Sequence, residues 1–475
     1  SFSAAPSTDA ITTANVIRKR AKLYDTEKNL SLIKLPKNTI KTHLTASNSG
    51  ASDSQYTLRK QFVASSNSSG VVTLSAGTNE TFLAHAEKDY TVSILTAGSG
   101  SGAAGDLVTA SGKVSGTGTG TLTITDNTIF GNAAKVKVVA TLLKTSVSAK
   151  TKTVKLCKQL KVEQEAATDA YGTRPTDKTI SLGRADAFKL VAVFDSETTS
   201  DAVAPAMTVG DITGTFIKGE VVTGGTSLAK GRIIDISSPI SYVQTSSAGF
   251  VVGDVVTGVT SGATTTIGAL TVGSTNITNR YLLDTGQRDN YYDISRIERK
   301  PGSAAPTGDV LVVYDYMEHG AGAFFTVDSY SDVADQMTYE DIPTYSATKV
   351  DPDLPAPSGQ FPLYDVFDFR PRVEDVAGTS TNVDTVDELT AHSFDIYHRQ
   401  FDGTGASITQ WPQPNSTVQS DFEYYLPRYD IISMNRQGNI VISKGTSAEI
   451  PQFPKTPDNC MKLCSIALPA YTFKP

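Results

Sequence analysis

Three aspartates within ten residues are the first candidates for chemistry. Asp284, Asp289 and Asp293 are spaced along a segment that also contains glycine and tyrosine. Clustered carboxylates of this kind can bind calcium or act as an acid–base pair. Their spacing is not that of a calcium-binding loop, and Arg288 stands next to Asp289. We therefore expect turn capping and ion pairing, and the charged residues of segment 370–375 are interpreted in the same way.

His319 is the second candidate, because it follows an apolar run and lies in a Gly-rich segment. A catalytic triad needs a nucleophile and an orienting acid, and no Gly-x-Ser-x-Gly elbow or cysteine-protease signature is present. Scattered histidines do not predict a metal site, and the chain has five of them: His43, His85, His319, His392 and His398. We expect His319 to be a turn residue. The sequence predicts no enzyme, and no catalytic, cofactor-binding or metal-ligating residue.

Two further patterns could bind ligands. Gly100, Gly102 and Gly105 have the spacing of a dinucleotide fingerprint, but residues 106–112 are too short and β-branched to form the helix that it requires. Several tyrosines could stack on sugars, although a partly buried strand face explains them equally. These are Tyr291, Tyr292, Tyr314, Tyr316, Tyr424, Tyr425 and Tyr429.

The elements that must position these residues are β-strands. Runs of four to eight residues rich in Val, Ile, Thr and Tyr dominate the chain, and apolar residues almost never follow a helical period over three turns. Short strands between Gly, Ser and Asn turns over residues 56–165 are typical of an immunoglobulin- or fibronectin-like sandwich. The Gly/Ser/Thr-rich stretch 97–119 is predicted to be a mobile loop or a long hairpin tip. The fold class predicted is all-β and multi-domain.

A repeat with an offset of 34 residues lies in the middle of the chain. Phe216, Gly219 and Glu220 of the first copy correspond to Phe250, Gly253 and Asp254 of the second. Both copies continue with a Val-Val-Thr-Gly run and a second apolar run, which predicts hairpins. Because one hairpin alone is marginal, the two copies are expected to pair into a small barrel or sandwich. The polar residues of the repeat are turn formers, so we interpret it as a structural module.

A chain of 475 residues exceeds what one core normally organises. The repeat interrupts strand-rich sequence, which suggests an inserted domain. The predicted division is an N-terminal arm and hairpin (1–55), a β-sandwich (56–165), a central β domain (166–205 plus 276–350), the inserted repeat module (206–275) and a C-terminal β-rich domain (351–475).

Charge and cysteine content limit the partners. Residues 1–165 carry 20 Lys/Arg against 11 Asp/Glu, and the remainder carries 22 against 38. This basic N-terminal third could contact nucleic acid, but its lysines are not clustered with aromatics, so complementary charge between stacked copies is favoured. Cys157, Cys460 and Cys464 predict buried or half-buried thiols made in a reducing cytoplasm. No apolar run reaches membrane-spanning length and no signal peptide is recognised, which predicts a soluble, non-secreted product without membrane insertion.

Four strings resemble a known protein family. Residues 281–295, 306–316, 367–378 and 421–426 are similar to large virion structural proteins of tailed bacteriophages, particularly contractile-tailed (T4-like) phages of marine cyanobacteria. The resemblance covers most of 180–475 and is looser over 1–165. It implies a non-enzymatic component of the tail, baseplate or fibre apparatus, without catalytic residues or cofactors. The implied partners are other tail, baseplate or fibre proteins.

Three functional hypotheses follow. The first is a structural tail protein that assembles in the host cytoplasm into the virion as a homo-oligomer, with a trimer favoured, because contacts between copies would cover strand edges. The second is a receptor-binding fibre or spike module that grips host surface polysaccharide. The third, a tailspike depolymerase, would need a long parallel β-helix and two acids facing a groove, whereas the sequence has only a two-copy repeat.

Overall fold

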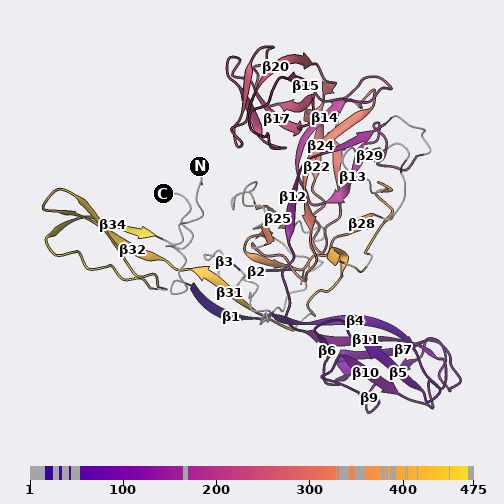
Figure 1. Ribbon diagram of the computed structural model, residues 1–475. Coiled ribbons are helices and arrows are strands. Elements are labelled where there is room, and N and C mark those ends of the chain that lie inside the picture. The colour runs from indigo at the N-terminus through magenta and orange to yellow at the C-terminus, as the bar shows by residue number, and fades with distance from the viewer. Residues whose placement is uncertain are drawn as a thin grey trace. The chain divides into compact units, whose positions relative to one another are not determined.

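The computed structural model confirms that the protein is all-β and contains many sheets (Figure 1). Among the described residues there is no helix of seven residues or more, and none that could cross a membrane. The structure describes residues 16–24, 31–34, 42–43, 54–163, 169–327, 329–330, 342–347, 359–375, 380, 383–385, 392–401, 403, 405–413, 416–448 and 450–468. Residues 1–15, in the predicted N-terminal arm, and residues 351–358, with which the predicted C-terminal domain begins, lie outside these residues.

The chain divides into two compact units, each made of separate stretches. The first unit contains residues 1–151, 322–370 and 410–475, and the second contains 152–321 and 371–409. The five-domain division drawn from the sequence stays a prediction. Short 3-10 turns occur at Glu87–Asp89, Thr278–Arg280 and Gly405–Ser407.

Two facing sheets form the main body of the first unit. The larger has the order β1-β31-β4-β11-β7-β8, with β3 on β31 and β6 on β11. Its strands are β1 (Val16–Tyr24), β3 (Thr42–His43), β4 (Gln55–Ser65), β6 (Glu80–Phe82), β7 (Tyr90–Thr96), β8 (Leu107–Val108), β11 (Lys135–Lys144) and β31 (Thr417–Tyr425). The smaller has the order β5-β10-β9. Its strands are β5 (Val71–Ser75), β9 (Val114–Ser115) and β10 (Thr121–Thr125).

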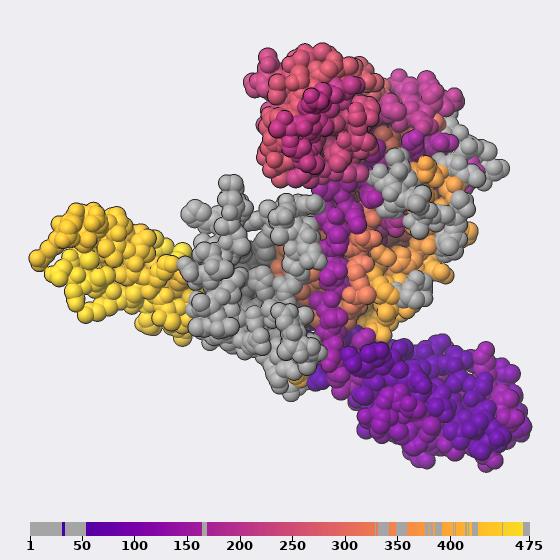
Figure 2. All heavy atoms as spheres, in the orientation of Figure 1, coloured from indigo at the N-terminus to yellow at the C-terminus, as the bar shows by residue number. Residues whose placement is uncertain are grey.

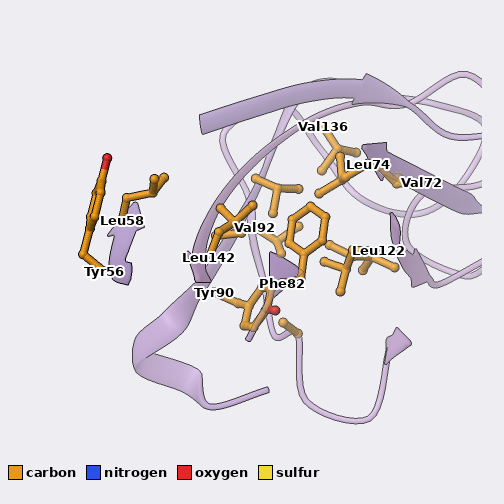
Figure 3. Close-up of a cluster of buried hydrophobic side chains, with 14 of the residues drawn as sticks. Tyr56, Leu58, Val72, Leu74, Phe82, Tyr90, Val92, Leu122, Val136 and Leu142 are labelled. Atoms are coloured by element: carbon orange, nitrogen blue, oxygen red, sulfur yellow. The ribbon is translucent and has the colours of Figure 1, made fainter. Parts of the chain in front are cut away.

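Alternating side chains build the core of this sandwich. In β10, Leu122 and Ile124 are fully buried, while the threonines that alternate with them are exposed or half-buried, as the period of two in a strand requires. They pack with Val72 and Leu74 of β5 and with residues of the larger sheet (Figure 3). The Gly-rich stretch 97–119 contributes β8 and β9, and it approaches the body so closely that a Cβ at Gly100 would lie 2.4 Å from the Ile129 carbonyl oxygen.

Three smaller sheets complete the first unit. Two of them are pairs, β2 with β27 and β25 with β26, and the third has the order β33-β32-β34. Their strands are β2 (Leu32–Lys34), β25 (Thr344–Ala347), β26 (Gly359–Pro362), β27 (Val366–Asp368), β32 (Arg428–Asn435), β33 (Ile440–Lys444) and β34 (Cys460–Leu468).

A five-stranded sheet is the centre of the second unit, with the order β21-β14-β24-β12-β29. A three-stranded sheet of order β13-β23-β22 packs against it, and β28 pairs with β30. The strands are β12 (Lys152–Val162), β13 (Thr179–Ala185), β14 (Ala187–Asp195), β21 (Thr275–Asn276), β22 (Tyr281–Asp284), β23 (Ile294–Arg299), β24 (Val310–His319), β28 (Glu374–Asp375), β29 (Val383–Thr385) and β30 (Arg399–Gln400).

The central strand β24 is apolar over most of its length because both of its faces are covered. Val310 and Val312 belong to the core shared with the three-stranded sheet. Leu311 and Val313 point to the opposite face, where they join a second core that includes Ile234 of the repeat module. A strand buried on both faces has little need for polar alternation.

The repeat module is a closed six-stranded barrel of order β15-β18-β17-β16-β19-β20 (Figure 1). Its strands are β15 (Ala206–Val209), β16 (Val221–Gly224), β17 (Lys230–Asp235), β18 (Ile240–Gln244), β19 (Val255–Gly258) and β20 (Thr264–Thr271). Adding 34 to a residue of β15, β16 or β17 gives a residue of β18, β19 or β20. The pairing of Val222 with Gly258 thereby maps onto that of Val256 with Gly224. The barrel is therefore two interlocked three-stranded copies, whereas the sequence predicted two-stranded ones.

Candidate functional site

A cluster of ionisable groups lies buried beside β24, in the second unit. The Asp186 carboxylate accepts hydrogen bonds from Lys152 Nζ (2.6 Å), His319 Nε2 (2.8 Å) and Gln287 Nε2 (3.2 Å). The Tyr292 ring stands edge-on to the His319 ring, with 4.7 Å between centroids, and Lys152 Nζ lies 4.6 Å from the Tyr292 centroid. The side chains of Lys152, Asp186 and His319 are at most 1% exposed.

Local backbone geometry brings Asp186 into this position. It connects β13 to β14 with φ of 59°, a left-handed conformation that aspartate tolerates better than most residues. Its carbonyl oxygen accepts a hydrogen bond from the amide of Met317, two residues before His319 on β24. His319 is the last residue of β24 and is buried, so the prediction that it is a turn residue is wrong. Its partner lies 133 residues away, a separation that no local pattern reveals.

Electrostatics fix the protonation states of the cluster. Burial alone would raise the pKa of Asp186, but the Lys152 ammonium and the His319 hydrogen bond outweigh it and hold that pKa below its usual range. Burial lowers the pKa of His319 to about 3, against the opposing effect of Asp186. At neutral pH an ionised carboxylate is therefore paired with an ammonium group and a neutral imidazole that donates from Nε2. These groups carry the Asp–His part of a triad, but they are closed off from solvent.

Two of the three aspartates singled out in the sequence, Asp284 and Asp293, are held by arginines. Asp284 pairs with Arg288 at 2.7 Å and with Arg296 at 2.8 Å. Asp293 pairs with Arg399 at 2.9 Å and lies 3.6 Å from each of the other two guanidinium groups. Burial would raise the pKa of Asp284, but its hydrogen bonds to the two arginines hold the pKa at about 2. Guanidinium groups thus occupy the positions that a cation would take, as the ion-pairing interpretation expected.

The charged residues around position 370 are also paired. In the first unit, Arg370 donates to both carboxylate oxygens of Asp368, at 2.9 and 2.8 Å, and both side chains are buried. In the second unit, Arg372 donates from Nε to Glu374 at 3.0 Å. Among the residues that the structure describes, no group of three or more His, Cys, Asp or Glu is arranged to hold a metal ion.

The acids of the repeat cap turns of the opposite copy. Asp254 accepts hydrogen bonds from the amides of Thr226 (2.8 Å) and Ser227 (3.2 Å) and from the Ser227 hydroxyl. In the equivalent contact, 34 residues along, Glu220 accepts from the amides of Thr260 (3.2 Å) and Ser261 (3.0 Å) and from the Ser261 hydroxyl (2.8 Å). Each copy therefore completes the other, and both carboxylates are buried in structural roles.

The cysteines differ in their surroundings. Cys157 is buried in a β12 bulge with φ of 50°, where its amide donates to the Asp315 carboxylate at 2.8 Å. Burial raises the pKa of its thiol to about 12, so this thiol is a poor nucleophile. Cys460 is half-buried, whereas Cys464 is exposed on β34. The prediction that all three thiols are at least half-buried is therefore wrong for Cys464.

The remaining ligand candidates occupy ordinary structural positions. Gly100, Gly102 and Gly105 lie in turns between β7 and β8, and no helix follows them. Tyr292, Tyr314 and Tyr316 are buried, with the Tyr314 hydroxyl donating to the Leu182 carbonyl oxygen. The side chains of Tyr424 and Tyr425 lie outside the described residues. The sequence analysis missed Tyr397, which is 73% exposed and lies 6.4 Å from Tyr171 between ring centroids.

Comparison with known proteins gives one match. A family described as a domain of unknown function (DUF4815) matches residues 366–473. The comparisons with curated proteins and with solved structures found no match.

Proposed function

We propose that this chain is a non-enzymatic structural protein of a tailed-bacteriophage virion, and that it makes subunit contacts in the tail, baseplate or fibre region. One observation carries the non-enzymatic part: the residues best suited to chemistry are neutralised inside the fold. The Asp186–His319 pair is closed off by Lys152 and Tyr292, and Asp284 and Asp293 are held by arginines.

Ion pairs of this kind suit a structural role better than a catalytic one. Removing one partner of the fully buried Lys152–Asp186 pair would leave an uncompensated charge and cost roughly 3–5 kcal/mol, so this pair favours one arrangement of the strands that hold it. A chain that must keep its shape while contacting neighbours benefits from such pairs. The location in the virion, and assembly in the host cytoplasm, rest on the resemblance of residues 281–295, 306–316, 367–378 and 421–426 to tail proteins.

Electron microscopy of phage particles tests the location. Gold-labelled antibodies against this chain are expected to decorate the tail, the baseplate or the fibre bases, and pre-adsorption with the purified chain is expected to remove the label. Gold on the capsid alone, or particles without specific label, would overturn the proposal. Release of sugar from host envelope by the purified chain would overturn the non-enzymatic part.

A receptor-binding role is the alternative, and one observation favours it. Tyr397 is largely exposed beside Tyr171, and paired exposed aromatic rings can stack on sugars. Binding of the full chain to a host glycan, abolished by Tyr397→Ala and retained by Tyr397→Phe, would support this role. Label confined to the distal fibre tips would support it as well.

A further inference from the structure

The C-terminal sheet of the first unit exposes one apolar face. Residues paired directly across antiparallel strands point to the same side. Ile432 of the central strand β32 is paired with Ile442 on one side and Cys464 on the other, and Met434 with Ile440 and Met461. These two rows, together with Ile466, form what we call the open face. Ile440, Ile442 and Met461 are 58–59% exposed. The sheet as a whole belongs to the yellow part of the chain in Figure 2.

The opposite face of the same sheet is covered by the connection from β33 to β34. Phe453 stacks on Tyr429 of β32, with ring centroids 4.3 Å apart, and Lys462 Nζ lies 5.4 Å from the Phe453 centroid. Ile431 and Ser433, which point to this side, are buried. One face of the sheet is therefore covered by its own chain, whereas apolar residues are exposed on the other face.

The strand edges of this sheet are open as well. Apart from β32, neither β33 nor β34 has a paired strand in the part of the chain that the structure describes. β34 has no proline and a single charged residue, Lys462, which points away from the open face. Natural edge strands that face only solvent normally carry charges, prolines or bulges, which prevent them from pairing with strands of other molecules. The bulge in β34, between the partners of Ile432 and Ser433, is one such feature, but β34 places no charge on the open face.

Charge on the open face is confined to one end. Lys444 and Asp430 are paired across β33 and β32, and Arg428 lies 3.3 Å from Asp430. The rows at Ile432 and Met434 carry no charge. Two copies can therefore meet through these rows without bringing like charges together, whereas a strongly acidic or basic partner would find no countercharge there.

We propose that the open face is an interface between copies of this chain. A second copy of the chain has the same apolar face, so each face can bury the other. Such a partner is available wherever the chain is made. Isologous contacts of this kind are the commonest in homo-oligomers, whose interfaces are more apolar than average. The inference deepens the proposed structural role and names its partner.

Analytical ultracentrifugation of the full chain tests the interface. The wild-type chain is expected to sediment with a mass above its monomer value of 50.4 kDa as concentration rises, with little effect of added NaCl. Ile442→Asp places a charge within the apolar rows of the open face and is expected to weaken association at least about 10-fold. The matched control is Ser465→Asp, on β34, where the exposed side chain points to the opposite face. This control is expected to associate like the wild type, and circular dichroism checks that both variants fold.

Two results would overturn the interface. One is a wild-type chain that stays monomeric up to about 100 µM, where even a weak interface populates dimers. The other is association that Ile442→Asp leaves unchanged. Binding of a different virion protein to a monomeric chain, if lost in Ile442→Asp, would also overturn the second copy as the partner. The electron microscopy described above tests the proposed function separately. If the chain is monomeric but antibodies label the tail, only the interface is excluded. If the chain is an oligomer but is absent from virions, only the proposed function is excluded.

Discussion

The two copies of the 34-residue repeat share much of their interior and differ in their exteriors. Inside the barrel, buried residues recur at equal spacing: Phe216 and Phe250, Val222 and Val256, Ala229 and Ala263, Ile233 and Ile267. On the outside, Ile234 of the first copy and the neighbouring Val243 of the second copy dock on the five-stranded sheet, where they pack with Cys157, Leu311 and Val313. The interior specifies the barrel, and the exterior decides which of its sides attaches to the body.

The equivalent side of the barrel, formed by β20 and β15, could not dock in this way. Ile234 corresponds to Gly268, which is exposed. Arg232, which forms a 2.9 Å ion pair with the buried Asp315, corresponds to the exposed Thr266. The two equivalent sides of the barrel have thus become a docked side and a solvent-facing side, and substitutions at matched positions measure that difference.

The largest difference is expected at the docking contact. Ile234→Asp places a carboxylate in a fully buried apolar cluster and is expected to lower the free energy of unfolding by about 3 kcal/mol or more. Gly268→Asp, at the matched exposed position, is expected to change it by about 0.5 kcal/mol or less. Urea denaturation followed by fluorescence gives both values.

The Cys157 thiol reports the same contact. Ile234→Asp is expected to expose Cys157 to alkylation by iodoacetamide at pH 8, whereas in the wild type burial and a pKa of about 12 protect it. A Cys460→Ser/Cys464→Ser background makes Cys157 the only thiol. Equal losses of stability in the two variants, or equal alkylation, would mean that the barrel does not depend on this contact.

The next largest effect on stability is expected at the two buried acids of the repeat, and here the two copies should behave alike. Asp254→Asn and Glu220→Gln each weaken the cap on the opposite copy and are expected to cost about 1–3 kcal/mol. A thermal melt of each variant, compared with the conservative surface change Asp235→Asn, measures the cost. A large loss in one variant and none in the other would contradict the reciprocal role.

The same acids predict a pH dependence. Burial opposes ionisation of both carboxyls, but hydrogen bonds outweigh it. Those to Glu220 come from the amide of Ile217 in the same copy and from the opposite copy, and those to Asp254 come mainly from the opposite copy. Both pKa values therefore lie below the ordinary 4.5 and 3.8. Their stabilisation is therefore complete above those ordinary values and is lost as the pH falls through the lowered ones. The stability of Asp254→Asn is expected to fall less steeply with acid than that of the wild type.

Two glycines next to these caps should show intermediate effects. A Cβ at Gly224 would lie 2.3 Å from Asp254 Oδ2, and one at Gly258 would lie 2.7 Å from Glu220 Oε2. Each Gly→Ala change is expected to cost about 1–2 kcal/mol. Double-mutant cycles give the measurement: Gly224→Ala should cost less when Asp254 is already alanine, and strict additivity would exclude the steric explanation.

The smallest difference concerns the glycines that precede the acids. Gly219 and Gly253 have φ of 92° and 87°, so alanine costs about 1 kcal/mol at either position. At Gly219 the added Cβ also lies 2.6 Å from Leu156 Cδ1, whereas nothing lies within 4 Å of one at Gly253. Gly219→Ala is therefore expected to be the more costly change in calorimetry, and Leu156→Ala to reduce its cost. Equal costs would show that Leu156 simply moves aside.

Local patterns in the sequence predict the strands and the small barrel, because alternation and glycine turns are local properties. The third strand of each copy was missed, since 206–209 and 240–244 share little more than a valine at equal positions. The partner of His319 was missed because it is Asp186, a residue in the left-handed conformation between two strands, far away in the sequence. The open face became visible only from strand register, since each strand alone reads as an ordinary β segment.

The crossed capping of the repeat has a consequence for how the barrel forms. A chain with one copy would carry an acid and a turn that cannot satisfy each other, because Asp254 reaches Thr226 and Ser227, and Glu220 reaches Thr260 and Ser261. Such a half would need a second molecule in trans. Joining the halves in one polypeptide replaces that encounter with an effective concentration in the roughly millimolar range. The duplicated segment thus behaves as a tethered dimer, whose assembly is independent of how many chains surround it.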